Sequence, residues 1–253
     1  MSDRSQQLRS RVEDDDPGRL LALSDGLFAT VLTILVLDLK LPDISQLVST
    51  GDVQRVINEF GVHLFSYVLT FVVAGVAWMA HHGDFNHIIR YNRRLLWYNL
   101  MFLLFVGLLP FTTASISNNH LSAASWSIYA MNNVALGVML SLTWGYAYAH
   151  RLTDPALPRR VARYQGLRHL ITPGIFLISI GLVILAPQAY LAPYSLLLIP
   201  VIQVFLDRRV LGKDTEPAFD ESRGAAWFWR LAAFIPVIIL IAVAVAAFNV
   251  TRP

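Results

Sequence analysis

The sequence predicts an all-α fold, a polytopic transmembrane helical bundle of six helices with an additional seventh span at the C-terminal end. The chain of 253 residues is 55% hydrophobic and only 15% charged, a composition that is rare in a soluble domain of this size. Its lysines and arginines lie at the ends of long apolar runs or between them. Lipid makes such runs helical, because every backbone N–H and C=O must find its partner within the segment.

The apolar runs divide the chain into four parts. Residues 1–18 are polar and predict a flexible cytoplasmic tail, and residues 19–206 hold six spans. Residues 207–224 predict a cytoplasmic linker, and residues 225–253 a further transmembrane helix. A helix of about 20 apolar residues crosses the hydrocarbon core. The expected spans cover about 20–39, 60–82, 95–117, 123–150, 167–186, 190–206 and 225–250.

The basic residues predict how the spans are oriented. Lysine and arginine are concentrated in the N-terminal tail and then in every second loop, as the positive-inside rule describes. We therefore expect a multi-pass protein of the cell (plasma) membrane with a cytoplasmic N-terminus. The tail has no apolar region before a cleavage site, so we expect no removable signal peptide. The basic residues form no face on a folded domain, which excludes a nucleic-acid partner.

The first span contains an acid, Asp25, and a stripe of small and polar residues. An ionisable side chain inside a span usually faces a bundle interior or a water-filled path. Gly26, Thr30, Thr33 and Leu37 share one helix face, with Ile34 at its edge. Copies of this stripe could line a conduction path that narrows at the apolar residues. The same stripe also fits close helix packing with threonines bonded to their own backbone, and spacing does not decide between the two.

A structural network is expected where the first and second spans meet. His81 and His82 end the second span at about the depth of Asp25, and Arg19 lies six residues before Asp25. Bonds between these groups would stabilise a buried carboxylate, and a histidine would make the network pH-sensitive. Other polar residues inside spans, Asn99, Asn132 and Asn133, are expected to form hydrogen bonds between helices.

The histidines of the segment HHGDFNH, residues 81–87, also fit one histidine box of a membrane metal enzyme. Such a site needs several boxes, and the remaining histidines are isolated in the sequence. The chain has no cysteine, which excludes disulfides and thiolate metal sites, and it has no serine in a nucleophile elbow. We therefore expect no enzyme activity, metal or cofactor.

The first span resembles the signature helix of the transmembrane protein 175 family, the endolysosomal-type potassium channels and their bacterial single-repeat homologues. The resemblance rests on Arg19, the run LSDGLFA at residues 23–29, Thr33 and the run LVLDL at residues 35–39. It continues through Trp78, the two histidines, Phe85 and the run LLWYNL at residues 95–100 to Pro110 and Phe111. The chain also lacks the carbonyl filter motif of ordinary potassium channels, as that family does.

The resemblance implies a homotetramer in the lipid membrane that conducts K⁺ ions through a central pore lined by four first helices. The family's filter threonine falls on Thr33 and its outer apolar layers on Ile34 and Leu37. Gly26 and Thr30 complete the expected lining. The implied structural network contains Arg19, Ser24, Asp25, Trp78, His81 and His82.

Three departures from the family pattern bear on this reading. Leu23 replaces the usual phenylalanine, Thr30 stands where a bulky aliphatic residue is usual, and the seventh span exceeds the six of the family. Water should enter a pore segment lined by hydroxyl groups at residue 30 more easily than one lined by aliphatic side chains. The position of the gate and the ion selectivity therefore depend on this residue. The alternatives to a passive channel are a proton-coupled secondary transporter that uses Asp25 with His81 or His82, and a histidine-box metal enzyme.

Overall fold

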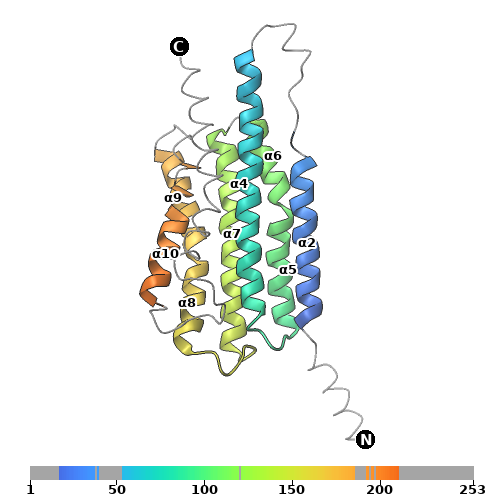
Figure 1. The fold of residues 1–253 in the computed structure, drawn as a ribbon, viewed down its shortest axis with the longest axis vertical. Helices are drawn as coiled ribbons and strands as arrows, with labels where there is room; N and C mark the ends of the chain where they lie inside the picture. The colour runs from blue at the N-terminus through green and yellow to red at the C-terminus, as the bar shows by residue number, and fades with distance from the viewer. Residues whose placement is uncertain are drawn as a thin grey trace, which may run out of the picture.

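The fold is described from a computed structural model of the chain, which describes residues 17–37, 39, 53–119, 121–185, 192–193, 195–196 and 198–210. These residues are almost all helical, and they contain no strand beyond one isolated bridge between Ile88 and Thr153. The expected all-α fold is confirmed. The helices are α2 (Pro17–Leu37), α4 (Val53–Phe85), α5 (Arg93–Gly107), α6 (Leu109–Asn118), α7 (Ala123–Ala149), α8 (Arg159–His169), α9 (Ile171–Leu185) and α10 (Leu198–Val210), shown in Figure 1.

The helices stand side by side as an elongated bundle, with α2 at one side and α9 and α10 at the other (Figure 1). Helix α7 packs against α5 and α6 on one flank and against α8 and α9 on the other. Helix α2 packs against α4, α5 and α6. The chain therefore has a centre, α7, and a peripheral first helix whose outer face no other described helix covers.

Four segments of the described residues are long and apolar enough to cross a membrane: Pro17–Leu37, Glu59–Phe85, Arg93–Asn118 and Arg159–Leu185. Helix α7 has the length, 27 residues, but not the apolar composition. Its Asn132, Asn133 and Thr143 are buried inside the protein. Because other helices surround α7, its side chains face protein more than lipid, and the segment can carry polar groups that a lipid-facing helix would not.

Two of the expected spans are each built from two helices, and a proline explains each break. Helix α5 ends at Gly107 and α6 begins at Leu109, next to Pro110. Helix α8 ends at His169 and α9 begins at Ile171, with Pro173 in its first turn. Proline has no N–H to donate to the carbonyl four residues earlier, and its ring clashes with that carbonyl.

The structure shifts several expected bounds. Helix α2 begins at Pro17, two residues inside the expected tail, because proline suits the first helical position, where its missing N–H leaves no bond unmade. Helix α4 begins at Val53, seven residues before the expected span, and α8 begins eight residues before the expected fifth span. Helix α10 continues to Val210, into the expected linker. The seventh span and most of the tail and linker lie outside the described residues.

Helices α7 and α9 approach closely at one glycine. A Cβ atom added at Gly137 would lie 2.7 Å from Cδ and 2.9 Å from Cγ of Pro173. Real Cβ atoms do not approach so closely, and the pyrrolidine ring is rigid. The contact between the two helices therefore requires glycine at residue 137.

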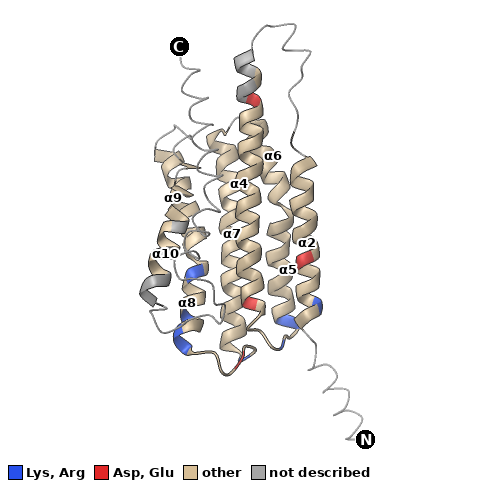
Figure 2. Cartoon of the chain, in the orientation of Figure 1, with Lys and Arg blue, Asp and Glu red and all other residues tan. Residues whose placement is uncertain are grey.

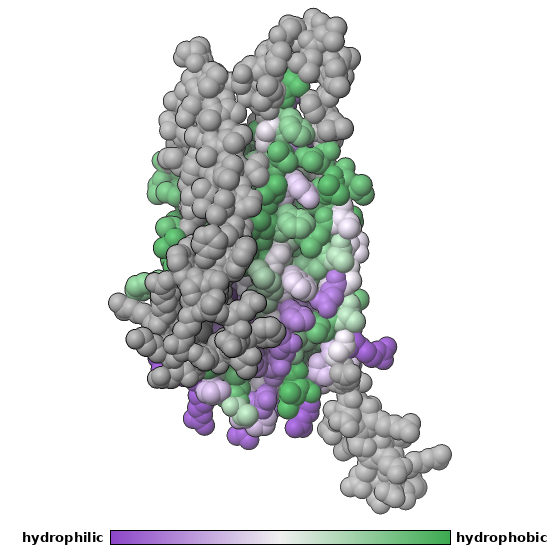
Figure 3. Space-filling view, in the orientation of Figure 1, coloured by the Kyte–Doolittle hydropathy of each residue, from purple (hydrophilic) through white to green (hydrophobic). Residues whose placement is uncertain are grey.

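Most of the described lysine and arginine positions lie near one end of the bundle. This is the end where α2, α5 and α8 begin and where α4 and α7 finish (Figure 2). Figure 3 shows hydrophilic side chains at the same end and hydrophobic ones along the side of the bundle. Arg19, Arg93, Arg94, Arg159 and Arg160 lie in the first turns of α2, α5 and α8, Arg163 and Arg168 farther along α8, and Arg90 and Arg151 in the loops after α4 and α7.

Candidate functional site

Helix α2 has one face packed into the protein and one face open. The packed face consists of residues spaced three or four apart, which places them on one side of a helix: Leu20, Ser24, Phe28, Val31 and Leu35. Phe28, Val31 and Leu35 join a core cluster with residues of α4, α5 and α7. The opposite face is the stripe that the sequence singles out. This division shows that the stripe does not pack inside the protomer.

The stripe is exposed along its whole length: Gly26, Thr30 and Thr33 are exposed, Ile34 is 43% exposed and Leu37 is 81% exposed. Both threonine hydroxyls donate to their own helix. Oγ1 of Thr30 donates to the carbonyl oxygen of Gly26 at 2.8 Å, and Oγ1 of Thr33 to that of Thr30 at 2.8 Å. The hydroxyl hydrogens therefore point back at the backbone, and the lone pairs of the oxygens are left for the open face.

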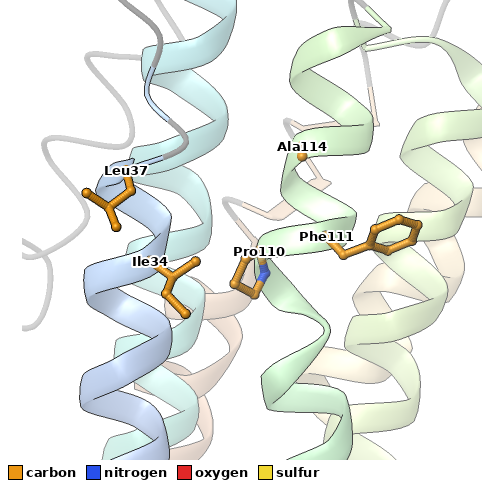
Figure 4. Close-up of a pocket in the computed structure, with 5 residues that line it drawn as sticks. All are labelled: Ile34, Leu37, Pro110, Phe111 and Ala114. Atoms are coloured by element: carbon orange, nitrogen blue, oxygen red, sulfur yellow. The ribbon is translucent and has the colours of Figure 1, made fainter.

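The stripe ends in a groove between α2 and α6. The groove has a volume of about 300 Å³ and is lined by Ile34, Leu37, Pro110, Phe111 and Ala114. Ile34 and Pro110 face each other across it (Figure 4). All five side chains that line it are apolar. The first helix thus passes from a hydroxyl-bearing segment to an aliphatic one as it runs away from the arginine-rich end.

Asp25 is half-buried beside this stripe, and its hydrogen-bond partner is a tryptophan. Nε1 of Trp78 in α4 donates to Oδ1 of Asp25 at 2.8 Å. The ring of Trp78 also lies against the ring of His82, with centroids 5.5 Å apart. A neutral indole N–H partners the carboxylate without neutralising it. The carboxylate of Asp25 thus lies beside the open face with a neutral hydrogen-bond donor as its partner.

A second, fully buried set of bonds ties α2 to α4 and α5. Nε2 of His81 lies 2.8 Å from Oδ1 of Asn99, and Nδ2 of Asn99 donates to Oγ of Ser24 at 3.1 Å. Oγ of Ser24 in turn donates to the carbonyl oxygen of Leu20 at 2.9 Å. All three polar side chains are 0% exposed. The ring of His81 also stacks on Phe102, with centroids 5.1 Å apart and planes 6° from parallel.

The network is arranged differently from the expected one. Within the described residues Asp25 bonds to Trp78 and not to Arg19 or a histidine, and Arg19 is exposed. His81 is instead held by Asn99, which the sequence marks only as a bonding partner between helices. That expectation is confirmed for Asn99 and for Asn132, whose Nδ2 donates to the carbonyl oxygen of Phe105 at 3.1 Å. It is wrong for Asn133, which bonds to Tyr129 of its own helix.

One buried polar cluster was not foreseen. Asp84 at the end of α4 is 0% exposed and accepts from Nε2 of Gln165 at 2.9 Å. Nε2 of His169 lies 2.9 Å from both carboxylate oxygens of Asp84. The sequence treats His169 as isolated because 85 residues separate it from its partner. The described residues hold no group of three or more metal-ligand side chains, so these histidines form no metal box there.

Comparisons with known proteins agree on one family. Residues 19–110 match the model of the family described as "Endosomal/lysosomal potassium channel TMEM175". A potassium channel of Streptomyces collinus is 28% identical over 191 residues, which cover 72% of this chain and 90% of that protein. A protein of Bos taurus named endosomal/lysosomal proton channel TMEM175 is 36% identical over 97 residues, which cover 36% of this chain and only 20% of that protein.

A solved structure shares the fold. The crystal structure of a lysosomal potassium-selective channel TMEM175 homolog from Chamaesiphon minutus aligns with a TM-score of 0.62 and 22% identity. The alignment covers 77% of this chain and 98% of that chain. All of these proteins are named as channels, which agrees with the expectation that this chain is not an enzyme. The resemblance expected from the first span is confirmed: residues 19–110 of this multi-pass membrane chain match the TMEM175 family.

Proposed function

We propose that the chain is one subunit of a potassium-preferring cation channel, with copies of α2 around a central pore. The observation that carries the proposal is the open stripe of α2, Gly26, Thr30, Thr33, Ile34 and Leu37, on a helix whose other face is packed. A lipid-facing helix gains nothing from exposed threonines. In an assembly, a second copy of the stripe facing the first across a shared axis would give the threonine hydroxyls polar neighbours. The bacterial relatives named potassium channels support the same reading.

The threonine oxygens suit a cation. Because the hydroxyl hydrogens of Thr30 and Thr33 donate to backbone carbonyls, the oxygens present lone pairs to the open face. Rings of such oxygens can replace part of the hydration shell of an ion. Ile34 and Leu37 then form an apolar constriction farther along, which closes the pore by excluding water. Asp25 near the arginine-rich end attracts cations to the entrance.

The arginine distribution supports a cytoplasmic N-terminus in a plasma membrane, because basic residues are retained on the cytoplasmic side. We propose a homotetramer on the family analogy. The permeant species is K⁺, and no cofactor takes part. The Ser24–Asn99–His81 bonds hold α2 against α4 and α5, so the stripe keeps a fixed rotation toward the axis.

A proton-coupled transporter is the alternative. Its relay would pass from Asp25 to His81 or His82. In the described residues Asp25 bonds to Trp78, and His81 belongs to a separate chain of bonds that ends at Leu20. No continuous hydrogen-bonded path joins the carboxylate to the imidazole among these residues, which favours passive conduction.

The absence of cysteine allows a direct test of the pore. In the variant Thr33→Cys, a cationic thiol reagent should block most of the valinomycin-independent K⁺ flux of the purified protein in liposomes. Leu185→Cys is the matched control, because Leu185 is 86% exposed and ends α9, a helix on the other side of the bundle from α2. The reagent should label it without changing the flux.

The same liposomes separate the hypotheses. Passive conduction requires K⁺ flux without a proton gradient, and Thr33→Val should change the ratio of K⁺ to Na⁺ flux. Thr172→Val on α9 is the control for the loss of one hydroxyl. Labelled Thr33→Cys with undiminished flux would refute the pore position, and flux that stops when the proton gradient is abolished would favour the transporter.

A further inference from the structure

The open face of α2 has a different neighbour on each side. On one side Asp25 is bonded to Trp78 of α4. On the other side Ile34 faces Pro110 of α6 across the groove (Figure 4). Asp25 and Ile34 are nine residues apart, which is two and a half helical turns, so they point in opposite directions from the axis of α2. Thr33 lies between these directions, on the open face. Helices α4 and α6 therefore border the open face on opposite sides.

Phe71 of α4 lies at the height of the groove between α2 and α6. Helices α2 and α4 run in opposite directions (Figure 1), and the bond between Asp25 and Trp78 marks a height that they share. At 1.5 Å per residue, Phe71 lies about 10 Å along α4 from Trp78, and Ile34 lies about 13 Å along α2 from Asp25. Both distances run away from the arginine-rich end. Phe71 and Ile34 thus differ in height by less than one helical turn.

Phe71 projects from the α4 side of the open face. It is spaced by four residues from Gly75 and by seven from Trp78, so the three residues share one face of α4. The ring of Phe71 lies against Tyr67 of its own helix, with centroids 6.0 Å apart, and the residue is still 43% exposed. A Cβ atom added at Gly75 would meet no atom within 4 Å. No other described helix therefore packs against α4 at Gly75, and part of the neighbouring Phe71 is open.

The groove on the α6 side has room for one large apolar side chain. Its volume of about 300 Å³ is at the lower end of the range for pockets that hold small molecules, and the five side chains that line it are apolar. Ile34 and Leu37 belong both to this groove and to the open stripe. The groove therefore opens beside the proposed pore wall, where neighbouring subunits have to meet if the pore is to be closed to lipid.

We propose that Phe71 of the partner subunit fills the groove between α2 and α6. The inference rests on the proposed pore, and it names the contact that closes the pore wall between subunits. In a ring, each subunit contacts the next through two different surfaces. With the open faces of α2 toward the axis, these surfaces are the α4 side of one copy and the α6 side of the next. Rotation about an axis along the membrane normal leaves heights unchanged, so the aromatic ring reaches the level of the groove.

Single cysteines test this contact, because the chain has none. One copy carries Phe71→Cys and a first tag, and another carries Ala114→Cys in the groove and a second tag. The two full-length chains are expressed together and oxidised in the membrane. Each copy has one cysteine, so every disulfide joins two subunits, and it forms only where the two Cα atoms come within about 7 Å.

We expect a mixed dimer that carries both tags, disappears on reduction and exceeds the dimers of either variant with itself. The matched control pairs Phe71→Cys with Leu185→Cys, because Leu185 is exposed but lies on α9, which borders neither side of the open face. This pair should give no mixed dimer above background.

The variant Thr33→Cys separates this inference from the proposed pore, because a bifunctional thiol reagent should link its copies across the axis. Linked Thr33→Cys copies without the mixed dimer would refute the contact and leave the pore, with the groove then open to lipid. Absence of both products would refute the ring itself. An excess of the Phe71→Cys dimer with itself would show a two-fold contact and would also refute the proposal. If Phe71→Cys does not fold, Gly75→Cys with Thr30→Cys tests the same two sides one turn nearer the arginine-rich end, and a mixed dimer is again required.

Discussion

Asn99→Leu should destabilise the protein, because Asn99 is the middle member of the buried bonds between α2, α4 and α5. The substitution removes two bonds between helices, to His81 and to Ser24. Such bonds in membrane proteins average about 0.6 kcal/mol each. It also leaves Nε2 of His81 buried without a partner, in a ring whose Nδ1 already has none. An unpaired buried group costs about 1–3 kcal/mol. The expected total is about 2–4 kcal/mol.

The double variant His81→Phe with Asn99→Leu tests the reasoning. Phenylalanine keeps the stacking of the ring on Phe102 and removes the buried polar nitrogens. Replacing both partners of a buried hydrogen bond by apolar groups is nearly neutral. The double variant should therefore be more stable than Asn99→Leu alone, as measured by denaturant unfolding in mixed micelles. Asn118→Leu, at an exposed position, is the control and should change stability by less than about 0.5 kcal/mol.

If the double variant is no more stable than Asn99→Leu, the cost does not come from the unpaired imidazole and the argument fails. A loss below about 0.5 kcal/mol in Asn99→Leu would refute it as well, because the bonds would then contribute nothing beyond an ordinary surface contact.

Two further substitutions test the packing of the C-terminal helices. Gly137→Ala should lower stability by about 1–3 kcal/mol, because its Cβ would meet the ring of Pro173. Gly145→Ala on the same helix is the control. Its Cβ would meet no atom within 4 Å, so it should be neutral in the same unfolding assay. His169→Leu removes one of the two side-chain hydrogen-bond partners of the buried Asp84 and leaves only Gln165, which should cost about 1–3 kcal/mol. Asp84→Leu combined with it should restore most of the Tm, and a double variant as unstable as the single one would contradict the explanation from the lost bond.

The sequence predicts the helical class and the place of the first helix well, because lipid leaves few alternatives. A long apolar run must be a helix, and spacing by three or four residues then separates the packed face of α2 from the open stripe. Prolines also mark the helix breaks at Leu108 and Leu170. The sequence predicts one span for each of these runs, since the two halves together have the length and apolarity of one.

Pairings between distant residues could not be predicted. His81 and Asn99 lie in different helices, and their contact depends on how α4 and α5 rotate against each other. The partners of Asp84, Gln165 and His169, come from α8, most of which precedes the expected fifth span at 167–186. The periodicity of a single sequence shows which side of each helix is packed. It does not show at which height along their axes two helices contact each other. Both buried clusters depend on that height.

The segment that carries the family likeness is not an independent folding unit. The core cluster that holds Phe28, Val31 and Leu35 of α2 also contains Leu136 and Leu140 of α7, which lie beyond the last matched residue. A chain cut after residue 110 would leave Phe102 and Val106 of α5 without much of their cover. Excising or transplanting residues 19–110 therefore requires α7 as well, because α7 supplies part of the core against which they pack.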